Sequence, residues 1–183
     1  MSCRLSIRTL AVGLSGLLVL ACGPTDANSS SSETSAPDPS SAAAPATEQT
    51  AIAPGDIAAV ENVSVSGEPG RYQFSVTVRS QETGCDQYAD WWEVVSESGE
   101  LLYRRILAHS HVDEQPFTRS GGPVPVQPGD LVTVRVHMNN TGYSPEARQG
   151  TVSDGAEFEA VTLAPDFAAA LAQQDPLPSG CTF

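Results

Sequence analysis

Apolar and polar residues alternate along two segments of this chain with the period of two that is typical of half-buried β-strands. In residues 71–79 the apolar positions are Tyr72, Phe74, Val76 and Val78. In residues 131–138 valines stand at positions 132, 134 and 136, with polar residues between them. Each pattern predicts a strand with one apolar face, which a second layer of structure has to cover.

Shorter apolar segments predict further strands, at 62–66, 91–95, 101–109 and 157–163. Ser96–Glu100 contains a glycine and has the composition of a hairpin turn. Gln127–Asp130 has the sequence Gln-Pro-Gly-Asp, which predicts a turn leading into the valine-rich strand. Residues 164–174 carry apolar residues at helical spacing after a proline, and they predict one short C-terminal helix.

These six or seven short strands, separated by turn signals, predict an all-β fold: an antiparallel β-sandwich with one short C-terminal helix. Trp91 and Trp92 on an early central strand, and the turn before the late valine strand, resemble immunoglobulin and fibronectin type III domains. Tyr143 follows the late strand and so does not match the tyrosine corner of the immunoglobulin pattern. The resemblance implies an architecture, and it carries no functional residues.

Residues 1–21 are predicted to be an export signal, in which Arg4 and Arg8 precede a mainly apolar run. The run is too short to span a bilayer. It ends in Val-Leu-Ala before Cys22, which resembles the lipobox of bacterial lipoproteins. The resemblance implies that cleavage falls before Cys22 and that Cys22 carries the lipid that anchors the chain.

The composition changes after this signal. Residues 22–56 comprise Cys22 and a stretch rich in Ser, Ala, Thr and Pro, which predicts a disordered stalk behind the lipid. Residues 57–183 form the predicted sandwich domain. We therefore expect this domain on the extracytoplasmic side of a bacterial cell envelope, with the membrane as one partner through the N-terminal lipid.

The charge of the chain excludes some partners. There are 22 acidic residues against 9 basic ones, for a formal net charge of −13, and every basic residue is an arginine. Such a chain is not expected to bind nucleic acid, because it has too little positive charge to neutralise a phosphate backbone. Docking on anionic lipid headgroups by charge alone is disfavoured for the same reason.

The cysteines predict one disulfide. Cys3 lies in the export signal and Cys22 is predicted to carry lipid, so Cys85 and Cys181 remain for the domain. In an oxidising compartment this pair is expected to form a bridge. The alternative is a metal site built on the two cysteines, but neither has a second cysteine or a histidine at ligand spacing.

The histidines raise a metal hypothesis. His109 and His111 are two residues apart, so on an extended strand both project from one face. Imidazole nitrogens suit copper and zinc, and His137 could supply a third ligand. Otherwise no cofactor is expected. The alternative is that these imidazoles cap loops and pair with neighbouring carboxylates.

The adjacent tryptophans and arginines raise a hypothesis about the surface. Trp91 and Trp92 face opposite sides of their strand, and an outward ring beside carboxylates is a common way for β-sandwiches to hold sugars. The alternative is that another segment covers that ring. Arg104 and Arg105 also face opposite sides, and the inner one needs a carboxylate. Asp90, Glu93 or Glu114 could provide it.

Residues 108–122 carry the densest set of polar groups, and Pro116 is expected to interrupt β-pairing there. We expect either a functional loop or a structural one, in which Phe117 fills the core and Glu114 pairs with Arg119 or Arg105. The candidate binding surface drawn from these segments comprises Trp91, Trp92, Arg105, Glu114 and Arg119.

No catalytic motif is found: the chain has no nucleophile elbow, no HExxH, no P-loop and no dinucleotide fingerprint. We therefore expect no enzyme. The sequence favours a lipid-anchored, extracytoplasmic β-sandwich module that binds a ligand or serves a structural role. The alternatives are a copper- or zinc-binding protein that uses its histidines and a carbohydrate-binding module, so the ligand is an unidentified protein, metal or glycan.

Overall fold

The structure is a computed structural model that describes residues 58–182. The predicted export signal, Cys22 and the stalk lie outside these residues. The elements of the described part are β1 (Ala58–Glu68), β2 (Arg71–Ser80), β3 (Ala89–Ser96), β4 (Leu101–Ile106), β5 (Phe117–Val124), β6 (Leu131–Met138), β7 (Gly142–Tyr143), β8 (Glu146–Thr151), β9 (Glu159–Thr162) and a 3₁₀ helix (Ala169–Gln173).

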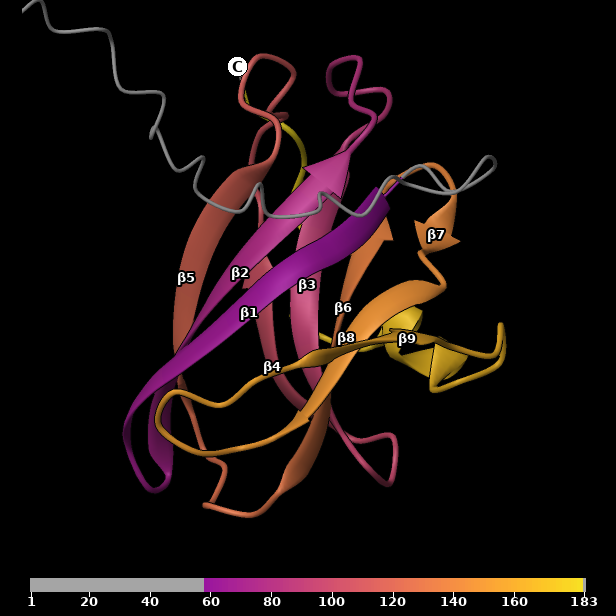
Figure 1. The fold of residues 1–183 in the computed structure, drawn as a ribbon. Coiled ribbons are helices and arrows are strands. Elements are labelled where there is room, and N and C mark those ends of the chain that lie inside the picture. The colour runs from indigo at the N-terminus through magenta and orange to yellow at the C-terminus, as the bar shows by residue number, and fades with distance from the viewer. Residues whose placement is uncertain (1–57, 183) are drawn as a thin grey trace, which may run out of the picture. The chain divides into compact units, whose positions relative to one another are not determined.

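The strands form two antiparallel sheets that lie face to face (Figure 1). The first sheet has the order β1-β2-β5, and the second has the order β4-β3-β6-β8-β9, with β7 paired to β6. The chain therefore changes sheet three times, between β2 and β3, between β4 and β5 and between β5 and β6, as in the Greek-key order of immunoglobulin-like sandwiches. The predicted all-β antiparallel sandwich is confirmed.

The core lies between the sheets and is made of the apolar faces that the alternation predicts. Tyr72, Phe74, Val76 and Val78 of β2 are all buried. Val132, Val134 and Val136 of β6 face them from the second sheet, and Trp92 of β3 fills the space between. The burial of these side chains is the main favourable contribution to folding.

The expectation of a loop over 108–122 is wrong in its second half, because β5 begins at Phe117 and pairs with β2. Pro116 lies just before the strand, and Pro123 lies in a strand at the edge of its sheet, where a missing N–H breaks no ladder. Gly121 allows this strand to approach the second sheet closely. A Cβ atom there would lie 2.7 Å from the Tyr103 ring.

The predicted C-terminal helix is shorter than expected and is a 3₁₀ helix. Its N-H groups bond three residues back, as Leu171 does to Ala168. The carbonyls of Phe167, Ala168 and Leu171 accept hydrogen bonds from arginine side chains instead of α-helical N–H groups. Only Leu171 of this helix is buried.

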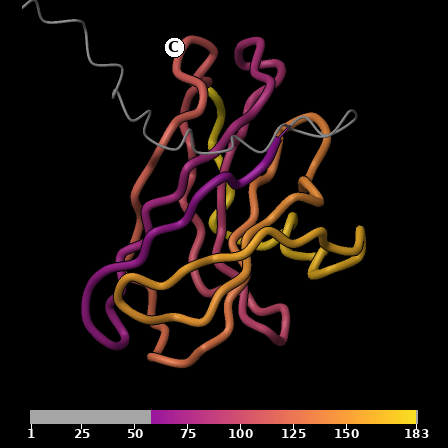
Figure 2. The backbone as a smooth tube through the Cα atoms, viewed as in Figure 1, coloured from indigo at the N-terminus to yellow at the C-terminus, as the bar shows by residue number. Residues whose placement is uncertain are grey.

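Residues 163–182, which we call the C-terminal strap, return along the second sheet to the end where the β2–β3 loop lies (Figure 2). There Cys181 forms a disulfide with Cys85, which confirms the predicted bridge. The backbone N–H of Thr182 donates to the Ala108 carbonyl at 2.7 Å. Within residues 58–182, no helix is long and apolar enough to cross a membrane.

Candidate ligand site under the C-terminal strap

The outer face of the second sheet carries a buried ion cluster centred on Glu93. The strand register places Glu93 of β3 opposite Arg104 of β4 on one side and Arg135 of β6 on the other. Arg104 Nη2 lies 2.6 Å from Glu93 Oε2, and Arg135 Nη2 lies 2.8 Å from Oε1. All three side chains are almost completely buried, so the carboxylate offsets part of the desolvation of two guanidinium groups.

The two guanidiniums also fix the strap. Arg104 donates to the carbonyls of Leu171, Gln174 and Pro176. Arg135 donates to the carbonyls of Phe167 and Ala168 at 2.6 and 2.9 Å. Five main-chain carbonyls of the strap thus accept hydrogen bonds from arginines of the sheet, which fixes the strap over the second sheet.

Aromatic rings surround the cluster. The guanidinium carbon of Arg135 lies 3.5 Å from the centroid of the Tyr143 ring, and that of Arg104 lies 4.4 Å from the centroid of Trp91. Burial, followed by the nearby Glu93 carboxylate, raises the pKa of Tyr143 to about 12. The phenol therefore stays protonated at neutral pH and remains a hydrogen-bond donor.

Trp91 lies on the outer face, as the strand alternation requires, but it is not exposed. It is 3% exposed and Trp92 is 0% exposed. His137 stacks on Trp91 with a centroid distance of 3.7 Å, and Arg104 covers part of the same ring. The exposed aromatic platform that the carbohydrate hypothesis requires is therefore absent at both tryptophans, and the alternative, in which the outward ring is covered, holds.

The predicted three-histidine site does not form. His137 Nδ1 lies 2.7 Å from Asp90 Oδ1 on the second sheet, whereas His111 stacks on Phe117 of the first sheet. The rings of His109 and His111 do lie close, with centroids 4.7 Å apart, although they stand in a loop rather than on a strand. In the described part of the chain, no group of three or more His, Cys, Asp or Glu side chains has the arrangement of a metal site.

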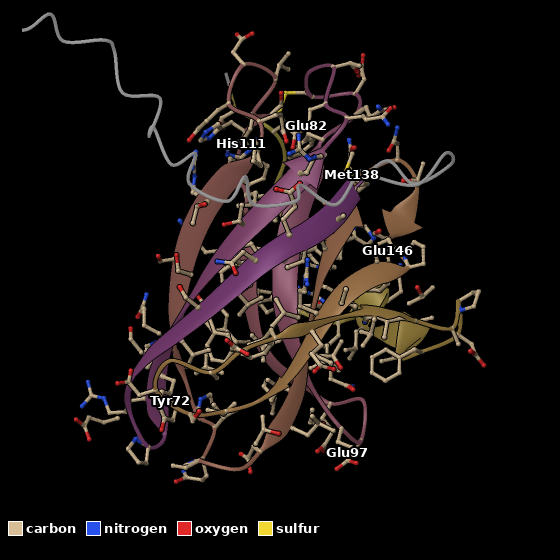
Figure 3. All side chains as sticks on the ribbon, in the orientation of Figure 1. Tyr72, Glu82, Glu97, His111, Met138 and Glu146 are labelled. Atoms are coloured by element: carbon tan, nitrogen blue, oxygen red, sulfur yellow. A yellow bond between two sulfur atoms is a disulfide. The ribbon has the colours of Figure 1, made fainter. Side chains whose placement is uncertain are left out.

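The loop from 107 to 116 has the features of the structural alternative. Phe117 is 1% exposed and fills the core, and Arg119 forms two hydrogen bonds with Glu114, at 3.0 and 2.8 Å. The backbone N–H of His111 donates to the Glu82 carboxylate, and Figure 3 shows both residues at the same end of the sandwich. Arg105 is exposed, and its predicted pairing with Glu114 is not formed, since Glu114 bonds to Arg119.

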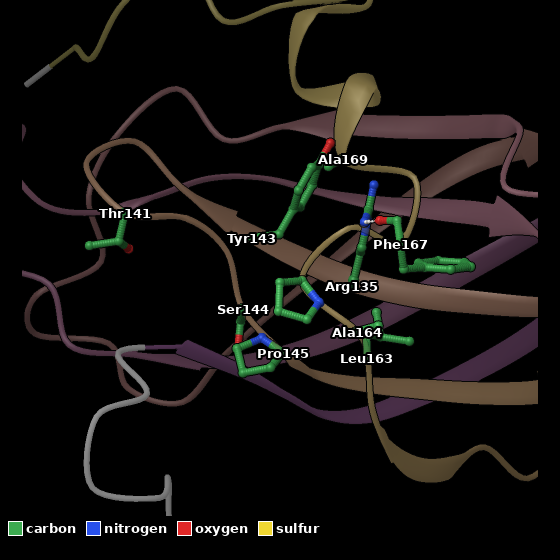
Figure 4. A pocket seen from close by; sticks show the side chains of 10 residues that line it. Arg135, Thr141, Tyr143, Ser144, Pro145, Leu163, Ala164, Phe167 and Ala169 are labelled. Atoms are coloured by element: carbon green, nitrogen blue, oxygen red, sulfur yellow. Dashed lines mark hydrogen bonds between the residues drawn. The ribbon is translucent and has the colours of Figure 1, made fainter.

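A pocket that the sequence did not indicate lies beside the ion cluster (Figure 4). Its volume is ≈ 440 Å³, within the range of about 300–1,000 Å³ that is usual for small-molecule sites. The strap forms one wall and the β7–β8 connection forms another. The lining residues are Arg135, Thr141, Tyr143, Ser144, Pro145, Leu163, Ala164, Pro165, Phe167 and Ala169.

The signal that could have found this site is Arg135 itself. It stands between two valines on a strand predicted to have one polar face, and the neighbouring strand carries Glu93. Glu93 is one of the three carboxylates expected to pair with an arginine of residues 104–105, and it bonds to Arg104. The second arginine, Arg135, and Tyr143 were not among the predicted site residues.

Comparisons with known proteins find a relative that matches part of the chain. A protein of Halomicrobium mukohataei described as "Putative lipoprotein" is 38% identical over 98 residues, which cover 53% of this chain and 48% of that protein. The chain thus spans about half of the length of this relative. No protein-family model matches the chain, and no solved structure matches it. The description of the relative agrees with the lipobox resemblance at Cys22.

Proposed function

We propose that this chain is a lipid-anchored, extracytoplasmic β-sandwich module that binds a ligand and catalyses no reaction. The lipobox resemblance at Cys22 and the lipoprotein relative support the anchor. The pocket of ≈ 440 Å³ under the strap is the observation that carries the binding role. The cell envelope is the location that this proposal implies.

The bonding of the buried polar groups supports a role without catalysis. Both carboxylate oxygens of Glu93 bond to guanidiniums, and His137 is turned to Asp90. A nucleophile or general base has to lie within hydrogen-bond reach of a reacting group, with its proton or lone pair available. The Glu93 carboxylate and the His137–Asp90 pair are instead bonded to neighbouring side chains.

The anchor is tested by metabolic labelling with palmitate. We expect the full chain to incorporate label, the Cys22→Ser variant to lose it, and the Cys3→Ser variant to retain it, because Cys3 lies in the segment that is removed. Membrane fractions of the same cells should retain the wild type and release the Cys22→Ser variant. Label that persists in Cys22→Ser would contradict the anchor.

A further inference from the structure

The charges beneath the pocket do not balance. Glu93 contributes one carboxylate, whereas Arg104 and Arg135 contribute two guanidiniums, so the buried cluster carries an excess of one positive charge. The carboxylate of Asp90, the next acid on β3, bonds to His137 instead. This excess is unusual for the domain, since residues 57–183 contain 17 acidic residues and only 7 basic ones.

Arg135 lines the pocket and has one N–H group without a partner among the described residues. Its Nε bonds to Glu93, its Nη1 donates to Phe167, and its Nη2 contacts both Glu93 and Ala168. A guanidinium has five N–H groups, so one N–H of Nη1 has no partner among residues 58–182. Figure 4 shows Arg135 between Tyr143 and Phe167, where it lines the pocket.

The remaining walls of the pocket are mostly apolar. The apolar lining residues include Pro145, Leu163, Pro165 and Phe167. Thr141 is exposed at the rim, and the Ser144 hydroxyl already donates to the Ala58 carbonyl. No acidic side chain lines the pocket. A ligand that fits these walls combines an apolar body with one anionic group, because a charge-assisted hydrogen bond to arginine is strong where water is excluded.

We propose that this pocket binds a small carboxylate with an apolar body, whose carboxyl group accepts a hydrogen bond from Arg135. The proposal rests on the binding role proposed above and gives its ligand class. The guanidinium is already held in place by Glu93 and by the strap carbonyls of Phe167 and Ala168. The apolar part of the ligand packs against Leu163, Pro145 and Phe167.

Calorimetric titration of the full chain with three matched probes tests the ligand class. The probes are 4-phenylbutyrate, its neutral amide 4-phenylbutanamide and the cationic 4-phenylbutylamine. We expect the carboxylate to bind at least about tenfold more tightly than the amide, and the amine to bind most weakly. Equal affinities for all three probes would overturn the ligand class and leave the pocket as an apolar site.

Two pairs of variants locate the binding. Ala169→Trp fills the pocket and should abolish the binding of 4-phenylbutyrate, whereas Ala170→Trp changes an exposed neighbour that does not line it. Thr141→Glu places a negative charge at the rim and should weaken binding at least about threefold, whereas Thr141→Gln should not. Both threonine variants change an exposed residue, so the fold should persist, and thermal melting checks this.

The outcomes separate this proposal from the one on which it rests. If 4-phenylbutyrate binds equally well to Ala169→Trp and Ala170→Trp, the site is elsewhere and this inference is wrong, although the module still binds a ligand. If no probe binds, both the ligand class and the pocket assignment are overturned. The palmitate result on Cys22→Ser is independent of either outcome.

Discussion

At the scale of single residues, Glu93 has the widest structural effect, because one carboxylate joins β4, β6 and, through the arginines, the strap. Replacing Glu93 with Gln would leave two buried guanidiniums without an opposite charge. We expect the free energy of unfolding to fall by about 3–5 kcal/mol, measured by urea denaturation. The exposed Glu97→Gln is the control and should change it by less than about 0.5 kcal/mol. Similar losses in both variants would contradict the central role of Glu93.

His111 is the residue that should make stability depend on pH. Neither of its ring nitrogens has a hydrogen-bond partner among the described residues, and burial lowers its pKa more than the Glu82 carboxylate raises it. The unfolded chain therefore takes up a proton first as the pH falls. The contribution of neutral His111 to the free energy of unfolding is fully present above the ordinary histidine pKa of about 6.5. It is lost as the pH falls below that value towards the lower pKa that His111 has in the folded chain.

The variant His111→Phe tests this pH effect. A phenyl ring can keep the stacking on Phe117 and cannot take up a proton. We expect the melting temperature of the wild type to fall between pH 7.5 and pH 5, and that of His111→Phe to fall less over the same range. Identical pH profiles would show that His111 has the same pKa in the folded and unfolded states and does not cause the pH dependence.

At the scale of elements, the alternation of apolar and polar residues predicted the strands that have one apolar face and one polar face. β2 and β6 occupy the predicted segments because alternation places their valines in the core. Turn chemistry predicted the β3–β4 hairpin, where Gly99 has a φ of 84°. One ion pair of the candidate site could be predicted in part. A buried arginine on β4 needs a carboxylate, and Glu93, which bonds to Arg104, was one of the three candidates.

Other elements depend on contacts between distant parts of the chain, which local pattern does not record. β5 has no alternation and contains two glycines and a proline, and it becomes a strand because β2 offers an open edge. The polar face of β6 looked exposed in sequence, yet Arg135 is buried because the strap, more than thirty residues later, lies over it. The pocket is formed by the same long-range contact.

The strap should depend on its disulfide, because only Leu171 of its 3₁₀ helix is buried. The bridge between Cys85 and Cys181 spans 96 positions, which corresponds to about 4–5 kcal/mol in the chain-entropy model. We expect the double variant Cys85→Ala/Cys181→Ala to melt many degrees lower. Hydrogen exchange should increase most in residues 163–182. Uniform exchange across both sheets would indicate that the bridge holds the whole sandwich instead.

At the scale of the whole molecule, the excess of negative charge predicts a response to salt. The formal net charge of −13 creates repulsion between exposed carboxylates. At 1 M salt the screening length is about 3 Å, so this repulsion largely disappears, whereas the buried Glu93 cluster is screened little. We expect the melting temperature to rise between 0.05 and 1 M NaCl.

Variants that remove charge should reproduce this effect without salt. Glu157, Glu159 and Asp166 are exposed, and their replacement with the matching amides should raise the melting temperature at 0.05 M NaCl. The same triple variant should then gain less from added salt than the wild type does. A melting temperature that falls with salt in both proteins would show that attractive surface pairs outweigh the repulsion.

The hydrogen bond from the Ser144 hydroxyl to the Ala58 carbonyl joins the rim of the pocket to the first residue of β1. In a protein held by its N-terminus, mechanical tension from the membrane enters the domain at Ala58. The same bond ties the β7–β8 connection, which lines the pocket, to the point where the chain enters the first sheet. Under the proposed anchor, the pocket wall is thus fastened to the point at which the tether pulls on the domain.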